Sequence, residues 1–250
     1  MRENTVRTRL SEGKPVFGVI SPTIDPIIVE YIGLVGFDFY MLDGEHGALS
    51  PAHAEHMVRA AESIDITPLA RVRSLDEKLI LQFLDTGIMG IMMPGCTTAD
   101  DCAALVRAVK YPPVGERGIG PVRAARYMLG GMSQQEYIRH ANNQTLVLPQ
   151  IEDITALDHL EEMCHVEGVD GFIIGPRDLA VTMGFYDSPS HEEVRKVIDQ
   201  IIEIVVRHNR IVGTVAATKE QAHALVDKGV RMILHSVAGL ISQSAKAFLS

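Results

Sequence analysis

FDFYMLDGEHGALSP, residues 37–51, contains the outline of one complete βα unit. Its hydrophobic beginning predicts a buried strand, and the charged segment Asp43–Gly47 follows where that strand ends. The pair Ser50-Pro51 is typical of a helix start, and an amphipathic pattern continues over 51–63. The stretch therefore predicts a strand, a loop with three ionisable side chains, and a helix.

The same alternation recurs along the chain. Short apolar runs predict strands over 16–20, 37–42, 68–72, 90–94, 145–151, 171–175, 211–215 and 232–236. Amphipathic stretches predict helices over 25–35, 51–63, 75–85, 98–109, 154–165, 191–208, 218–228 and 238–249. Strands that alternate with helices indicate parallel βαβ units.

Eight such units in 250 residues favour a (β/α)₈ barrel, the TIM barrel, as one domain over residues 1–250. A doubly wound sheet has the same local pattern and remains an alternative. The one long irregular insertion covers 112–143 and ends in a short helix-like segment over 133–142. Because long loops in compact domains are usually functional or mobile, we expect the insertion to be one or the other.

Composition limits the partners. The net charge is -9, and Lys and Arg are not clustered, which argues against nucleic acid. The N-terminus is polar and the apolar runs are of strand length, so we expect no signal peptide, no membrane span and a cytoplasmic protein. Three cysteines without a C-x-x-C pair suggest neither a disulfide framework nor a structural zinc site.

In a (β/α)₈ barrel the active site lies at the carboxyl ends of the strands, so polar residues that end predicted strands are the candidates. They are Asp43, Glu45 and His46, then Arg71 and Arg73, then Gln150, Glu152 and Asp153, then Arg177 and Asp178, and finally His235 and Ser236. Their convergence predicts a polar site at one end of the barrel.

Glu152 and Asp178 follow neighbouring strands and offer a pair of hard oxygen ligands. Such a pair, with room for substrate oxygens and water, suits octahedral Mg²⁺, Mn²⁺ or Co²⁺ better than tetrahedral Zn²⁺. Alternatively, one or both of these carboxylates cap the helices that follow, because Asp178 and Asp153 each precede a helix-like stretch. The residues alone leave both interpretations open.

His46 and Asp43 together predict a dyad, in which the histidine acts as a base and the carboxylate fixes its tautomer. The alternative is a hydrogen-bonded histidine at a strand–loop junction. Arg71 ends an apolar strand, where a fixed cation can bind a carboxylate or stabilise an enolate oxygen. An ion pair of Arg71 with Glu45 or Glu152 in the barrel mouth is compatible with that role.

Six segments in one order resemble the metal-dependent 2-oxo acid aldolases of the HpcH/HpaI family. They are FDFYMLDGEHG, PLARV, DTGIMGIMMPGC, ERGIG, LPQIED and EGVDGFIIGPRDLAVTMG. The family includes 2,4-dihydroxyhept-2-enedioate, 2-dehydro-3-deoxyglucarate and 2-keto-3-deoxyrhamnonate aldolases. The resemblance, from about Gly18 to the end, implies a phosphoenolpyruvate/pyruvate-type barrel. It also implies a homo-hexamer, a trimer of dimers, with the last helix exchanged between protomers.

The resemblance further implies where substrate and metal bind. It places the divalent ion, Mg²⁺, Mn²⁺ or Co²⁺, on Glu152 and Asp178, with Gln150 close by. The substrate carboxylate is received by the segment Gly175, Pro176, Arg177 and Asp178, at the start of a short helix.

Four residues receive catalytic roles from the same resemblance. Arg71 holds the ketone oxygen as it becomes an enolate. His46, oriented by Asp43, is the base and acts through water. Asp85 is the acidic residue that a neighbouring subunit lends to the site.

The implied reaction cleaves a 4-hydroxy-2-oxo acid into pyruvate, or a close 2-oxo acid, and an aldehyde through a metal-stabilised enolate. Alternatives are a lyase for acyl-CoA esters, of the citrate lyase β or malyl-CoA lyase group, and a non-catalytic metal-binding barrel. A Schiff-base aldolase would need a lysine in the barrel mouth, where we expect none. Arg177 stands where the family commonly has a small residue and could favour an extra carboxylate on the substrate.

Overall fold

A computed structural model describes residues 2–186 and 188–250, in which eight parallel strands close into a barrel in sequence order. The strands are β1 Val16–Ser21, β2 Phe39–Asp43, β3 Thr67–Arg71, β4 Gly90–Met93, β5 Leu146–Ile151, β6 Gly171–Ile174, β7 Ile211–Val215 and β8 Met232–Ser236. Each lies within two residues of its predicted bounds. The (β/α)₈ barrel is confirmed, and the doubly wound alternative is wrong, because β8 pairs with β1.

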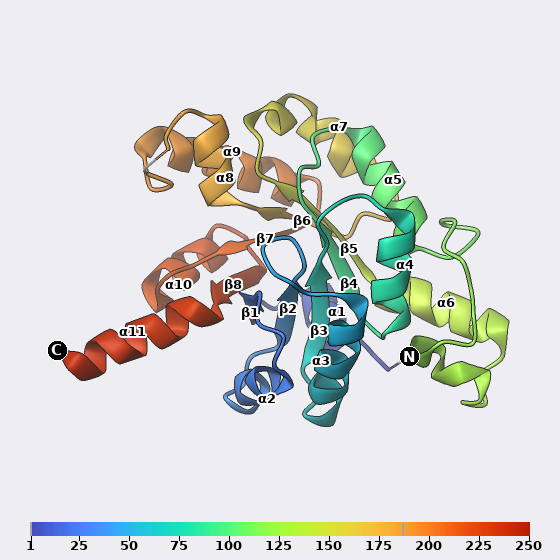
Figure 1. Cartoon of the computed structure of the whole chain (residues 1–250). Coiled ribbons are helices and arrows are strands. Elements are labelled where there is room, and N and C mark those ends of the chain that lie inside the picture. Colours follow the sequence, from blue (N-terminus) through green and yellow to red (C-terminus); the bar gives the residue numbers. More distant parts are fainter. Residues whose placement is uncertain (1, 187) are drawn as a thin grey trace.

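Helices surround the barrel (Figure 1). They are α2 Pro26–Leu34, α3 Pro51–Ser63, α4 Glu77–Asp85, α5 Ala99–Val109, α7 Leu160–His165, α9 Glu192–Arg207, α10 Lys219–Asp227 and α11 Val237–Leu249. The helix predicted over 154–165 is divided into a 3-10 helix, η2 Ile154–His159, and α7. Side chains at the predicted starts do cap: Ser50 accepts a hydrogen bond from the backbone N–H of His53.

Four further elements lie outside the main alternation: α1 Thr5–Ser11, η1 Arg123–Met128, α6 Gln134–Gln144 and α8 Pro176–Thr182. The insertion contains η1 and α6, so the helix-like segment predicted over 133–142 is confirmed. Within η1, Arg126 and Tyr127 have positive φ values of 49° and 55°, a left-handed conformation that is uncommon for residues other than glycine.

The short helix α1 closes the amino-terminal end of the barrel. Val6 and Leu10 pack into the same apolar cluster as the inward-facing strand residues Phe39 and Leu148. Asn4, with 0% of its surface exposed, caps α1 by accepting a hydrogen bond from the backbone of the helix. Its Nδ2 also donates to the carbonyl oxygens of two distant residues, before β4 and at the end of α6, at 3.1 and 2.8 Å. One side chain thus connects three parts of the fold.

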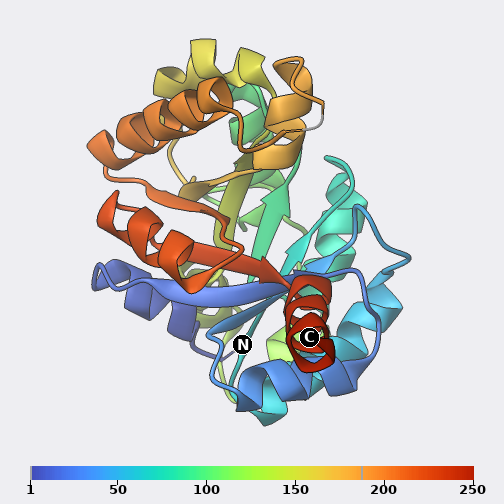
Figure 2. The same cartoon turned by 90° about the vertical axis from the view of Figure 1, so that its left-hand side faces the viewer.

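Helix α11 leaves the barrel wall and ends far from it, as the two perpendicular views show (Figures 1 and 2). Its end exposes Phe248 and Leu249, the former with 89% of its surface accessible. Among the helices of residues 2–186 and 188–250, none combines the length and the apolarity that crossing a membrane requires.

We predict that Asn4→Ala lowers the free energy of unfolding by about 2–4 kcal/mol, because it removes a helix cap and the Nδ2 donor to the carbonyl groups of Met89 and Gln144. The carbonyl of Met89 keeps its bond from the backbone N–H of Leu146, so in the described part of the chain that of Gln144 is the one left without a donor. Urea titrations monitored by circular dichroism measure the change. Asn143→Ala is the matched control, since Asn143 is exposed on α6 and its loss should stay within about 0.5 kcal/mol. Equal effects of the two substitutions would contradict the role of Asn4.

Candidate active site

A buried ion pair joins the ends of β2 and β3. The strand register places Asp43 opposite Arg71. Arg71 donates through Nε to Asp43 Oδ1 at 2.9 Å and through Nη2 to Oδ2 at 2.7 Å, a bidentate arrangement. Burial alone would raise the pKa of Asp43, but the hydrogen bonds and charge of Arg71 outweigh it and lower that pKa. Both groups are therefore charged, and the guanidinium is fixed.

Asp43 also holds the loop that follows it. Its Oδ1 accepts hydrogen bonds from the backbone N–H groups of Glu45 and His46, at 3.1 and 3.2 Å. Position 44 leaves no room for a side chain, because a Cβ on Gly44 would lie 2.8 Å from the carbonyl oxygen of Arg71. The prediction that the Asp43 carboxylate fixes the His46 imidazole is corrected here. Both carboxylate oxygens of Asp43 accept hydrogen bonds from Arg71, and the His46 imidazole is exposed. Asp43 therefore positions His46 through its backbone N–H.

Glu45 completes the cluster of charges around the guanidinium. Its Oε2 lies 3.0 Å from Nη1 of Arg71 and 4.0 Å from Nε2 of His46. The ion pair predicted between Arg71 and Glu45 is confirmed. Two carboxylates thus neutralise one arginine and hold it in place.

Glu152 follows β5, where two neighbours hold its carboxylate by hydrogen bonds. Oε1 accepts a hydrogen bond from the backbone N–H of Gly95 at 2.9 Å, and Oε2 accepts one from the amide of Gln150. Burial, and then the negative charges of Glu45 and Asp178, raise the pKa of Glu152 to about 7. The site is therefore short of positive charge around Glu152.

The segment after β6 approaches Glu152 closely. A Cβ on Gly175 would lie 2.6 Å from Nε2 of Gln150 and 3.0 Å from Oε2 of Glu152, so only glycine fits there. Gly175 is the cap position of α8, and Asp178 lies inside the first turn of that helix. The capping alternative for Asp178 is therefore wrong, whereas Asp153 does cap η2 and accepts from Thr155 N–H at 2.9 Å.

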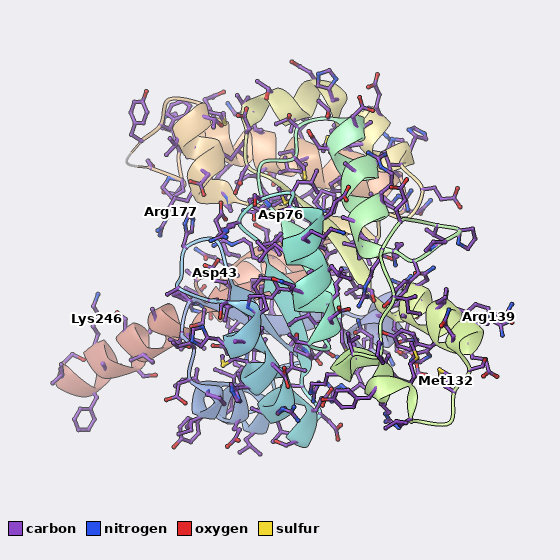
Figure 3. The ribbon with its side chains drawn as sticks, turned by 45° about the vertical axis from the view of Figure 1, so that its right-hand side comes forward. Asp43, Asp76, Met132, Arg139, Arg177 and Lys246 are labelled. Carbon is purple, nitrogen blue, oxygen red and sulfur yellow. The ribbon has the colours of Figure 1, made fainter. Side chains whose placement is uncertain are left out.

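One cavity of about 430 Å³ brings most of the predicted residues together. Its polar lining includes His46, Arg71, Gln150 and the segment Gly175–Asp178, and its size is within the usual range for ligand sites. Asp43 and Arg177 lie at the same end of the molecule (Figure 3). Asp43 and Glu152 do not line the cavity themselves but contact residues that do. Asp43 accepts a hydrogen bond from Arg71, and Glu152 accepts one from Gln150.

A divalent cation fits this set of donors. Within residues 2–186 and 188–250, no three or more His, Cys, Asp and Glu side chains group as metal ligands. However, Glu152 and Asp178 are close enough for charge repulsion, and Gln150 Oε1 is buried without a hydrogen-bond partner in the part of the chain described. Two carboxylates that leave most positions to water and substrate oxygens are typical of Mg²⁺ and Mn²⁺ sites.

Asp85 is not brought into this cavity. It ends α4, and its carboxylate forms an ion pair with Arg117 at 2.9 Å. Burial raises the pKa of Asp85 although Arg117 opposes the change. The catalytic role predicted for Asp85 therefore finds no support in the lining of this cavity.

Sequence reasoning missed two parts of the site. Gly95 contributes only its backbone N–H, for which no residue type gives a signal. The apolar part of the cavity includes Ile20, Val215 and Leu234, which read as ordinary strand residues. Their positions at the ends of β1, β7 and β8 were the only available clue.

A sequence model of the family described as HpcH/HpaI aldolase/citrate lyase matches residues 17–241. The chain belongs to this family. A hydroxypyruvate/pyruvate aldolase of Cupriavidus necator is 30% identical over 97% of this chain and 89% of its own length. A 2-keto-3-deoxy-L-rhamnonate aldolase of Escherichia coli is 31% identical over 97% of this chain and 90% of its own.

Solved structures agree with this membership. An HpcH/HpaI aldolase from Desulfitobacterium hafniense has a TM-score of 0.90 and 29% identity, covering 97% of this chain and 94% of that one. The citrate synthase SbnG has a TM-score of 0.88 and 26% identity, covering 97% and 95%. The predicted resemblance is confirmed, and this HpcH/HpaI protein is an enzyme of a lyase family.

We predict that Glu152→Gln stabilises the chelator-treated protein above pH 7. Because the pKa of Glu152 is raised from 4.5 to about 7, its contribution to stability is complete below pH 4.5 and is lost as the pH rises through about 7. The uncharged amide avoids this loss, by about 1–2 kcal/mol after allowance for partial exposure. Urea unfolding at pH 8 and pH 5 measures the difference, and a gain of equal size at both values would contradict the assignment.

Proposed function

We propose that this chain is a divalent-metal-dependent aldolase that cleaves a 4-hydroxy-2-oxo acid into pyruvate, or a close 2-oxo acid, and an aldehyde. One observation carries the proposal: a buried, rigidly held guanidinium lines the same cavity as Asp178, next to Glu152. That combination stabilises negative charge on an oxygen bound between them. Two relatives support it by name, one as a hydroxypyruvate/pyruvate aldolase and the other as a 2-keto-3-deoxy-L-rhamnonate aldolase.

The reaction needs removal of a hydroxyl proton at C4 and a place for the electrons of the C3–C4 bond. Those electrons become the enolate of the 2-oxo acid, whose oxygen gains negative charge. When bound by Glu152 and Asp178, the cation supplies Lewis-acid stabilisation of that charge. Arg71 donates an N–H group to the same oxygen, and its pairing with Asp43 prevents it from turning away.

His46 is the residue that we assign to the proton. Its imidazole is exposed and lines the cavity, and its backbone is held by Asp43. A histidine can accept a proton near neutral pH, directly or through a water molecule. The segment Gly175–Asp178, together with Gln150, is assigned to the carboxylate end of the 2-oxo acid, because it lines the wall next to Glu152.

We also propose the homo-hexamer with an exchanged α11. Helix α11 stands away from the barrel and exposes Ile241, Phe248 and Leu249, and α2 exposes Leu34 and Val35 with 73% of each surface accessible. Large apolar surfaces of this kind usually mark an interface. In such an assembly Asp85 would serve the site of a neighbouring subunit. Three buried free cysteines are compatible with the cytoplasmic location that we propose.

We predict that chelation abolishes pyruvate release from a panel of 4-hydroxy-2-oxo acids, and that Mg²⁺, Mn²⁺ or Co²⁺ restores it. Glu152→Ala should lower the rate at least about 100-fold and weaken Mn²⁺ binding measured by titration calorimetry. Treatment with pyruvate and borohydride should leave no covalent adduct in the mass spectrum. Unchanged release by Glu152→Ala would refute the metal site, and a trapped adduct would indicate a Schiff-base enzyme instead.

The shared site predicts complementation between inactive variants. Asp85→Ala and Glu152→Ala should each be inactive alone, yet co-expressed chains should regain about a quarter of wild-type activity, because random assembly leaves that share of sites intact. Steady-state assays of the purified mixture measure the effect. Activity no higher than that of the two separate variants would place Asp85 outside the site.

A further inference from the structure

A second cavity, of about 400 Å³, lies at the opposite end of the barrel from the active site. Asp65 and Met89 in its lining come just before β3 and β4, whereas the active site lies where the strands end. Segment η1 of the insertion forms another wall, and the beginning of the chain lies beside it (Figure 1). We call this cavity the arginine cleft, because its lining includes Arg2, Arg59, Arg123 and Arg126.

Positive charge prevails in the arginine cleft. The lining contains four guanidinium groups but only two carboxylates, those of Glu62 and Asp65, in a chain whose net charge is -9. Burial lowers the pKa of Arg2, although Glu62 and Asp65 act in the opposite direction. The carboxylates of the lining therefore compensate its cations only in part.

Two of the arginines are fixed by bonds to the backbone. Arg123 donates through Nη1 to the carbonyl oxygen of Thr86 at 2.8 Å and forms an ion pair with Glu62. Arg2 donates to the carbonyl oxygen of Ile66. The Nε atoms of Arg2 and Arg123 are nevertheless buried without a hydrogen-bond partner in the described part of the chain. Each guanidinium is thus positioned by the protein and keeps an unused donor.

Arg126 is available in a different way. Its side chain is exposed, and within residues 2–186 and 188–250 its guanidinium forms no ion pair and no hydrogen bond. The backbone at Arg126, Tyr127 and Met128 has positive φ values of 49°, 55° and 58°. Three consecutive left-handed residues are costly for side chains other than glycine, and such strain is concentrated in binding sites. Here it accompanies the placement of Arg126 and Tyr127 in the lining.

We propose that the arginine cleft is a second ligand site, which binds a small metabolite with two or more oxyanion groups, phosphates or carboxylates. A guanidinium recognises either group through paired N–H donors. The cations come from three segments, the residues before α1, helix α3 and η1, which favours a ligand with charge at more than one end. The volume of about 400 Å³ is within the usual range for small-molecule sites.

The test is titration calorimetry of the full chain in Mg²⁺ buffer with two probes. Fructose 1,6-bisphosphate carries two phosphates, tricarballylate carries three carboxylates, and fructose is the uncharged control. At least one anion should bind with a Kd below about 1 mM, and the tighter one identifies the oxyanion. Arg126→Gln should weaken this binding about 10-fold or more, because a charged hydrogen bond is lost, whereas Arg126→Lys should retain part of it.

Two further arginine variants are the matched controls. Arg139 is exposed on α6 of the same insertion but outside the lining, so Arg139→Ala should bind the anion as the wild type does. Arg177 lines the active-site cavity instead, so Arg177→Ala should also keep the affinity. An equal loss in Arg139→Ala would indicate a general effect of net charge, and one in Arg177→Ala would place the anion in the active site. Either result would overturn the inference.

Hydrogen–deuterium exchange locates the anion independently. The bound anion should slow amide exchange in 123–128 of the wild type and should have no such effect in Arg126→Gln. If neither anion binds, or if Arg126→Gln binds as tightly as the wild type, the four arginines only stabilise the insertion. The inference does not depend on the proposed aldolase reaction, because none of these measurements needs a substrate to turn over.

Discussion

The buried pair of Asp43 and Arg71 is the interaction on which the rest of the site depends. Removing two charges from water is costly, and such a pair often stabilises a protein less than apolar residues would. Its value lies in position: the pair holds the guanidinium toward the cavity, and Asp43 simultaneously binds the backbone of Glu45 and His46. One carboxylate thus holds the ends of β2 and β3 and the loop after β2 in a fixed arrangement. Loss of Arg71 would leave the buried Asp43 carboxylate without its counter-charge, whereas loss of Asp43 would leave Arg71 paired with Glu45 alone.

The charges around this pair are unbalanced in a way that fits metal binding. Arg71 is shared by Asp43 and Glu45, which leaves Glu152 and Asp178 to repel each other. Burial is the main cause of the raised pKa of Glu152, and the negative charges of Glu45 and Asp178 raise it further. A divalent cation would offset these charges and draw the carboxylate into its ionised form. The same arrangement that disfavours the metal-free state therefore favours the occupied one.

The fold could be predicted because each βα unit has its own local signal, and strand ends then locate the polar residues. The pairing of Asp43 with Arg71 could not be predicted, because it depends on the register between β2 and β3 rather than on the spacing from Asp43 to His46. Gly95 acts through its backbone, and α1 is too short for a periodic pattern, so neither carried a signal. Likewise, the place of Arg177 in the lining is visible only when the cavity is assembled.

Part of the cavity wall comes from one short helix. The first turn of α8 presents Arg177 and Asp178 at adjacent positions, and the cap residue Gly175 brings this turn close to Gln150 and Glu152. The lining from β7, β8 and the loop after β7 combines the apolar Val215, Ala216, Ala217 and Leu234 with the polar His235 and Ser236. Changes in those residues would alter the space that is left for the aldehyde. Catalysis and choice of aldehyde would then be separable within one barrel, since the catalytic groups come from other strand ends.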